Sequence, residues 1–237
     1  MGNGDALPRR VQPEVLDALG ADDPAAQRAR RDLRRLHHVI GTLPILLQAL
    51  DRALDHPPRR ILELGAGDGS MMLQLAKCRA ARWPDVAVTL LDRQGVVEAQ
   101  TLAGLRAVGW TPTLVTADVF DWLEQPPSDT WDAVVANLFV HHFQPRELSR
   151  LLNAVAAHAR VFFCCEPRRG ALPLLGSHLV GLIGAGPVTR EDAVLSVHAG
   201  FRRQELTAAW PQPDGWRLQE YPARLFSHCL LATRRDA

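Results

Sequence analysis

A glycine-rich turn directly after an apolar run constrains the fold of this 237-residue chain more than any other feature. The run at residues 60–64 ends in the sequence GAGDG, residues 65–69, and a stretch with helical spacing begins at Ser70. Glycines allow positive φ and let backbone amides approach a ligand without an intervening Cβ. In open α/β sheets, a strand, a glycine loop and a helix in this order form a ligand-binding turn. The loop therefore predicts a bound cofactor at the carboxyl end of this strand.

Short apolar runs alternate with stretches of helical spacing after the loop. This alternation is typical of parallel strands joined by crossover helices, so it predicts a doubly wound α/β sheet. A short connector around Pro222 and Ala223 favours an antiparallel hairpin at the end, so we expect seven strands, mostly parallel with the last antiparallel. The expected strands are residues 60–64, 86–91, 113–116, 133–137, 161–165, 216–221 and 225–232, and the expected helices after the loop are 70–82, 96–108, 146–158 and about 202–209.

Residues 1–56 have no strand pattern and carry the signals of helix starts and stops. Gly20 and Gly41 end the first two expected helices, at 13–19 and from Pro24, where Asp23 is the expected N-cap. A third helix is expected over about 43–54. We expect residues 1–56 to form a helical N-terminal cap or lid, and residues 57–237 to form the α/β domain.

Composition and spacing exclude several classes of protein. The chain has 27 Lys and Arg against 26 Asp and Glu, so a net charge of +1 gives no reason to expect nucleic acid as a partner or stable membrane insertion. The four cysteines fit neither a zinc knuckle nor a disulfide framework, and we find no metal-spaced set of ligands, so we expect reduced thiols and no metal. With no apolar N-terminal stretch of signal-peptide length, these features predict a cytoplasmic protein. The most apolar window, 171–188, is interrupted by Pro and Gly and is expected to face protein rather than lipid.

Acidic residues accompany the glycine loop and the ends of later strands. Glu63 lies two residues before the first glycine, where a carboxylate suits the amino group of an amino-acid moiety, and Asp92 follows 23 residues after Gly69. Asp118 ends the third expected strand, and Asn137 ends the fourth, before Leu-Phe-Val-His-His-Phe at 138–143. In this order the motifs resemble those of class I S-adenosylmethionine (SAM)-dependent methyltransferases, in the branch that methylates quinones and polyketides.

The resemblance implies a Rossmann-like fold with SAM as cofactor and S-adenosylhomocysteine (SAH) as product. It implies that Asp92 holds the ribose hydroxyls, that Asp118 faces the adenine amine, and that Val119 lies against the ring. The cofactor-binding residues that we expect are Glu63, Gly65, Ala66, Gly67, Gly69, Asp92, Arg93, Asp118, Val119 and Asn137.

A sulfonium already activates the methyl group, so the protein has to align an acceptor and exclude water. A phenol or enol acceptor gains from a base that titrates near neutral pH, which indicates histidine. His141 and His142 follow the fourth strand at the expected rim of the acceptor site and are the catalytic candidates. A structural role for this pair is the alternative, and His37 and His38 in the expected cap are the second choice.

These features together predict SAM-dependent methyl transfer to a small, largely apolar biosynthetic acceptor that is phenolic, quinone-like or polyketide, with O-methylation favoured over C-methylation. Two alternatives stay open: a SAM-binding scaffold or regulator without catalysis, and an NAD(P)-dependent oxidoreductase. The apolar segment 171–200 is expected either to line the acceptor pocket as an insertion or to form an ordinary buried helix. A small-molecule acceptor is the expected partner, and a homodimer is left open.

Overall fold

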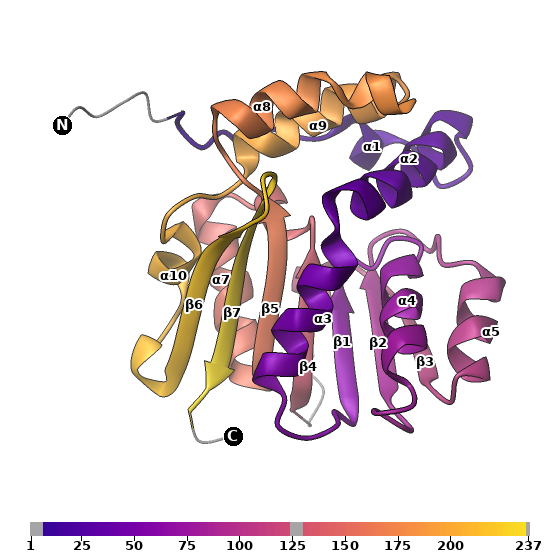
Figure 1. The fold of residues 1–237 in the computed structure, drawn as a ribbon, viewed down its shortest axis with the longest axis vertical. Helices are drawn as coiled ribbons and strands as arrows, with labels where there is room; N and C mark the ends of the chain where they lie inside the picture. Colours follow the sequence, from indigo (N-terminus) through magenta and orange to yellow (C-terminus); the bar gives the residue numbers. More distant parts are fainter. Residues whose placement is uncertain (1–6, 124–129, 236–237) are drawn as a thin grey trace.

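A central seven-stranded sheet organises the computed structural model, which describes residues 7–123 and 130–235 (Figure 1). The strand order is β3-β2-β1-β4-β5-β7-β6. β7 is antiparallel to both of its neighbours, while the pairs among β1 to β5 are parallel. Consecutive strands depart in opposite directions from the boundary between β1 and β4, and ligands in such sheets bind at this switch point, outside the carboxyl ends of the strands. The strands are β1 (Arg60–Leu64), β2 (Ala87–Asp92), β3 (Thr111–Thr116), β4 (Trp131–Asn137), β5 (Ala159–Pro167), β6 (Trp216–Ala223) and β7 (Ser227–Arg234).

The predicted fold class and all seven predicted strands are confirmed, with shifted ends. β5 is longer than expected because it pairs with β4 on one side and with β7 on the other, and the second pairing continues to Pro167 opposite Ser227. The position of the hairpin connector was wrong. Pro222 and Ala223 belong to β6, and the chain reverses at Arg224, which has a φ of 54°.

Helices pack on both faces of the sheet and bury one apolar cluster on each. The first face is covered by α3 (Thr42–Ala53), α4 (Ser70–Arg79) and α5 (Ala99–Ala107), and the second by α6 (Val119–Leu123), α7 (Pro145–His158) and α10 (Glu205–Ala209). α7 shows how the sequence specifies such a helix: Leu148, Leu151, Leu152 and Val155 recur at helical spacing and are buried against the sheet. Pro145 occupies its first turn, where a missing N–H costs nothing.

A further layer lies across the carboxyl ends of the strands, at the top of Figure 1. It consists of α1 (Val15–Ala18), α2 (Pro24–Ile40), α8 (Ala171–His178), η2 (Val180–Ile183) and α9 (Pro187–Ala199), and we call it the lid layer. Asp23 caps α2 by accepting a hydrogen bond from the Ala25 amide, and Gly41 ends it with a φ of 75°, as the sequence predicted. Of the three helices predicted within residues 1–56, α1 and α2 join the lid layer, whereas α3 packs into the core of the sheet. Short 3₁₀ turns form at η1 (Val140–His142) and η3 (Pro213–Gly215).

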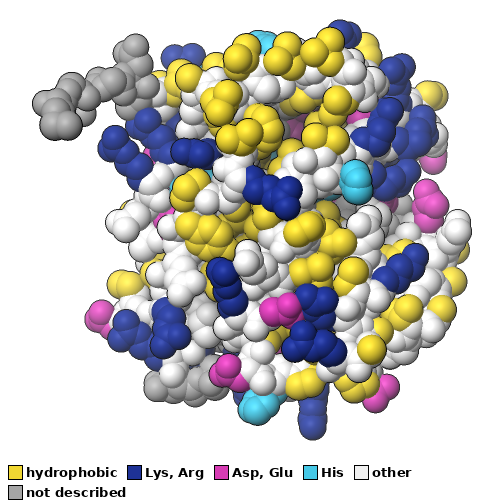
Figure 2. All heavy atoms as spheres, in the orientation of Figure 1, with side chains coloured by type: hydrophobic (Ala, Val, Ile, Leu, Met, Phe, Trp, Pro, Cys, Tyr) yellow, Lys and Arg dark blue, Asp and Glu magenta, His cyan; other side chains and the backbone are white. Residues whose placement is uncertain are grey.

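The apolar window 171–188 is not buried as a whole, so the interpretation as an ordinary buried helix was wrong. Leu172, Leu175, Leu179 and Leu182 are exposed on its outer side because no described element covers it, and Figure 2 shows apolar side chains along the top of the molecule. Among the described residues, no helix is long and apolar enough to cross a membrane. The helix α9, which the sequence did not indicate, begins with Pro187 in its first turn.

Candidate functional site

The glycine loop between β1 and α4 adopts a conformation that side chains disfavour. Gly65, Gly67 and Gly69 have φ values of 66°, 54° and 69°. A Cβ at Gly65 would collide with the ring of Phe139, whereas a Cβ at Gly67 would meet no atom within 4 Å. The loop is fixed from β2, because the Leu91 carbonyl accepts the Ala66 amide at 3.0 Å. It therefore leaves room for a ligand at its tip and packs tightly at its base.

Three carboxylates converge on this loop. Asp92, at the end of β2, accepts the Gly67 amide at 2.8 Å and the Gln94 amide at 2.8 Å. Glu63, on β1, is 2% exposed, and its Oε2 has no hydrogen-bond partner among the described residues. Burial, with smaller contributions from Asp68 and Asp92, raises the pKa of Glu63 to about 8. A cation placed here would gain from all three groups.

Asn137 lies at the carboxyl end of β4, the strand beside β1. Its Nδ2 donates to Nδ1 of His37 on α2 at 3.2 Å, while its Oδ1 is buried with no partner among the described residues. Burial lowers the pKa of His37 to about 4, so this imidazole is neutral at physiological pH. Leu138 follows with a φ of 48°, a strained conformation for a residue with a side chain.

The remaining predicted cofactor residues lie at the ends of β2 and β3. Asp118 is exposed and accepts the Phe120 amide at 2.8 Å, while its neighbour Val119 is buried. Arg93 is directed to the lid layer, where its guanidinium donates to the Asp17 carbonyl at 3.2 Å. The structure thus gathers the predicted cofactor residues at the carboxyl ends of β1 to β4, and Arg93 ties this edge to α1.

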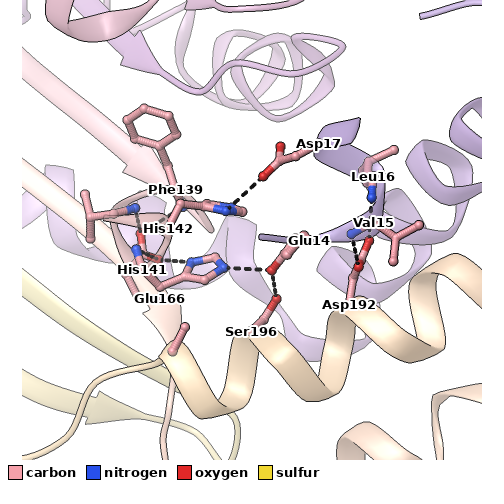
Figure 3. A network of polar contacts seen from close by, with 12 residues as sticks. Glu14, Val15, Leu16, Asp17, Phe139, His141, His142, Glu166, Asp192 and Ser196 are labelled. Carbon is pink, nitrogen blue, oxygen red and sulfur yellow. Dashed lines mark hydrogen bonds and ion pairs between the residues drawn. The ribbon is translucent and has the colours of Figure 1, made fainter. Parts of the chain in front are cut away.

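His141 lies between two carboxylates (Figure 3). Its Nδ1 is 2.7 Å from Glu166 Oε2, and its Nε2 is 3.2 Å from Glu14 Oε1. Glu166, which is fully buried, also accepts the backbone amides of Phe139 and Val140, each at 3.1 Å. Burial opposes a charge on His141, but the two carboxylates outweigh it and raise its pKa to about 9. The ring therefore carries a proton at neutral pH.

His142 is one-quarter exposed and faces α1, where its Nδ1 lies 3.4 Å from Asp17 Oδ2. The rings of His141 and His142 are 4.2 Å apart between centroids. Donor atoms of Glu14 and of both histidines lie within 4.8 Å of one another, so this group could hold a metal ion, for which the sequence gave no signal.

Two further side chains fasten the N-terminal segment to α9. Asp192 accepts the amides of Val15 at 2.7 Å and Leu16 at 3.1 Å, and Ser196 hydrogen-bonds Glu14. Burial raises the pKa of Asp192 to about 6. Sequence reasoning missed Glu14, Asp192 and Ser196 because their partners are more than 100 positions away along the chain.

A cavity of about 310 Å³ lies between the lid layer and the ends of β4 and β5. Its polar lining includes Glu14 and Glu166, the carboxylates that hold His141, but the described lining residues include neither histidine. Most of its lining is apolar: Leu16, Ala29, Leu33, Leu36, Val39, Ile40, Leu138, Cys165, Pro167, Pro173, Leu179, Val180, Ile183, Ala193, Val197 and Phe226. The segment 171–200 contributes to this wall.

Known proteins share this architecture. Magnesium protoporphyrin IX methyltransferase from Synechocystis PCC 6803, solved with bound SAH, is 19% identical with a TM-score of 0.54, and 84% of each chain is covered. An O-methyltransferase family protein from Burkholderia thailandensis is 14% identical with a TM-score of 0.62, covering 90% of this chain and 61% of that one. The mitomycin 7-O-methyltransferase is 18% identical with a TM-score of 0.59, covering 92% and 60%. At these identities the likeness shows the fold.

Sequence comparison gives the family. The ribosomal protein L11 methyltransferase of Rhodopseudomonas palustris is 32% identical over 153 residues, which are 58% of this chain and 49% of that protein. The chain thus spans about half the length of this curated relative. The family model described as a methyltransferase domain matches residues 30–230. Because this match covers most of the chain, the protein belongs to the methyltransferase domain family.

Proposed function

We propose that the protein methylates a small, largely apolar acceptor that is phenolic, quinone-like or polyketide, at oxygen rather than carbon. The observation that carries this proposal is the apolar cavity beneath the lid layer, at the ends of β4 and β5. Its volume of about 310 Å³ lies within the range of small-molecule sites. A cavity roofed by helices supports a small acceptor over a ribosomal protein, the substrate class in the name of the curated relative.

The residues at the strand ends fit SAM. Glu63 Oε2 and Asn137 Oδ1 are buried acceptors without partners among the described residues, on the neighbouring strands β1 and β4. When bound, SAM supplies a methyl group activated by its sulfonium, together with a cationic amino group. We assign the amino-acid end to Glu63 and Asn137, with the loop residues Gly65, Ala66, Gly67 and Gly69 beneath it. We assign the ribose to Asp92 and the adenine to Asp118 and Val119. Arg93 belongs to the same site, where it connects the end of β2 to α1.

The chain itself aligns the acceptor and keeps water out. The apolar wall from α2, α8 and α9 desolvates the acceptor, and the polar side, with Glu14, Glu166 and Ser196, offers hydrogen bonds to a hydroxyl group. Holding two reactants in one geometry accelerates a transfer without covalent participation of the protein. In this account α1 and α2 act as the cap expected for residues 1–56.

We keep His142 as the proton acceptor in this proposal, although neither histidine is among the described residues that line the cavity, and we assign His141 a positioning role. His141 already holds a proton between Glu14 and Glu166, so it fixes the N-terminal segment rather than accepting another proton. His142 is more exposed than its neighbour and faces α1. His37 stays the second choice, supported by its neutral ring and by its position on the helix whose Leu33 and Leu36 line the cavity.

Ligand binding and turnover together test the proposal. We expect SAH to raise the melting temperature, whereas NAD and NADP leave it unchanged, and we expect label from methyl-labelled SAM in the ether product of an alkylphenol. Ribosomal protein L11 serves as the macromolecular control acceptor. Stabilisation by SAH without turnover on any acceptor would favour the non-catalytic scaffold. The oxidoreductase alternative is overturned by the family match.

A further inference from the structure

A patch of exposed apolar side chains covers the outer face of the lid layer (Figure 2). We call it the lid patch and define it as Val39, Leu172, Leu175, Leu179, Leu182 and Ile183. Their exposed fractions run from 40% for Ile183 to 83% for Leu182. Single exposed leucines are ordinary on protein surfaces, but a contiguous group of this kind marks a surface that meets another apolar phase.

Basic side chains surround the lid patch although the whole chain is nearly neutral. Arg31, Arg34, Arg35 and His38 are exposed on α2, and together with Val39 and Ile183 they line a shallow hollow beside the patch. The only acid of α2, Asp32, is 1% exposed and is paired with Arg35. Residues 167–190, which include α8 and η2, contain no Asp or Glu. Arg34 is paired as well, with Asp68 of the glycine loop, so three arginines face two acids and the surface beside the patch carries a small excess of positive charge.

The lid patch is continuous with the apolar cavity. Val39, Leu179 and Ile183 are exposed at the surface and also line the cavity, so they form its outer rim. The rim that an acceptor would pass on its way from the patch to the cavity therefore carries apolar side chains.

We propose that the lid patch docks the protein on the surface of an anionic phospholipid bilayer. The leucines would enter the headgroup region while the arginines of α2 contact lipid phosphates, a mode that needs no membrane-spanning helix. A second copy of the chain is a poor occupant, because a symmetric contact through the patch would bring arginines against arginines. The inference goes beyond methyl transfer, since docking is measured without acceptor and can fail independently of turnover.

Vesicle sedimentation tests the inference with the full chain. We expect the protein to sediment with vesicles of equimolar phosphatidylcholine and phosphatidylglycerol, less with phosphatidylcholine alone, and less as salt is raised. Leu182→Glu should lower partitioning about tenfold or more. Arg31→Gln should lower it about fivefold.

Matched variants away from the lid layer are the controls. Leu114→Glu on β3 and Arg106→Gln on α5 change exposed residues of the same types and should leave partitioning as in the wild type. An unchanged melting shift with SAH shows that Leu182→Glu remains folded. Two outcomes overturn the inference: no preference for the anionic vesicles, or a dimer in light scattering that Leu182→Glu dissociates while vesicles are not bound.

Discussion

Glu63 is a single buried residue that makes the stability of the folded protein depend on pH. Its carboxyl group is buried beside Asp68 and Asp92, and the pKa of Glu63 rises from 4.5 to about 8. In the unfolded chain the group ionises near 4.5, so the folded state binds the proton more tightly than the unfolded state. The stability contributed by the protonated form is therefore lost as pH rises from about 4.5 to 8.

The variant Glu63→Gln should change the free energy of unfolding and the affinity for SAH in opposite directions, so the two effects can be measured separately. Without the ionisable group, the unliganded protein should gain about 1–3 kcal/mol of stability at pH 8 relative to wild type, with a flatter pH dependence between about 5 and 8. SAH affinity should fall about tenfold or more, since a charged partner of the amino group is lost. Urea unfolding at several pH values and calorimetric titration measure the two effects. The exposed Glu98→Gln is the control, and an unchanged SAH affinity in Glu63→Gln would remove Glu63 from the cofactor site.

The proton acceptor is also a question at the scale of one residue. His142→Ala should lower kcat about a hundredfold on a phenolic acceptor while leaving SAH affinity unchanged. His37→Ala should retain most of the turnover. Steady-state rates of both variants decide between His142 and His37 as the base. A large loss of kcat in His37→Ala with little loss in His142→Ala would assign the base to His37. Full turnover in both variants would mean that holding the acceptor close to the methyl group is sufficient for transfer, without a general base.

Where the signal is local, the sequence predicted which residues gather at the carboxyl ends of the strands. The three glycines and Glu63 lie within seven positions, and the acids at the strand ends recur in order along the chain. The partners of His141 could not be predicted in this way. Glu166 is 25 positions away and reaches His141 through the pairing of β4 with β5. Glu14 is 127 positions away and reaches it through the docking of the N-terminal segment on α9.

At the scale of elements, the N-terminal segment is held down by charge more than by apolar packing. None of the four residues of α1 is buried, while Glu14 and Asp17 meet His141 and His142, and Asp192 accepts two backbone amides of the segment. The pKa of His141 is raised from 6.5 to about 9, so this ion pair contributes fully below about 6.5 and is lost as pH rises through about 9.

Glu14→Gln should loosen α1 at neutral pH. In the wild type we expect proteinase K to cleave the segment before Pro24 faster as pH rises through about 9, while Glu14→Gln should be cleaved rapidly already near neutral pH. Timed digestion followed by mass spectrometry measures the rates, with the exposed Asp22→Asn as the control. Equal cleavage of wild type and Glu14→Gln across this range would show that the ion pair does not hold the segment.

The ends of a helix were predicted correctly where the sequence contains residues that start or stop helices. Asp23, Pro24 and Gly41 bounded α2 correctly. The structure of the segment 171–200 was harder to predict, because its glycines interrupt the helical pattern and its apolar side chains lie on both the inner and the outer side. Pro173 and Val180 face the cavity, while Leu172 and Leu175 face outward, and apolar composition alone does not reveal which side another element covers.

At the scale of the whole molecule, the sheet and the lid layer enclose the space where chemistry would occur. The sheet brings the predicted cofactor residues to its carboxyl edge, and the lid layer forms the apolar roof of the cavity. In the proposed function, the methyl group passes to an apolar acceptor held in this cavity.

The most direct test is kcat/KM at saturating SAM for a series of para-alkylphenols of increasing chain length, in wild type and in Ala193→Phe. Ala193 lines the cavity from α9, so the added ring should occupy acceptor space. We expect kcat/KM to rise with alkyl length in the wild type, as each buried methylene contributes about 0.8 kcal/mol at most. In Ala193→Phe we expect the rise to be lost while SAH affinity is unchanged. A flat series in the wild type, or an undiminished rise in Ala193→Phe, would contradict the proposed function.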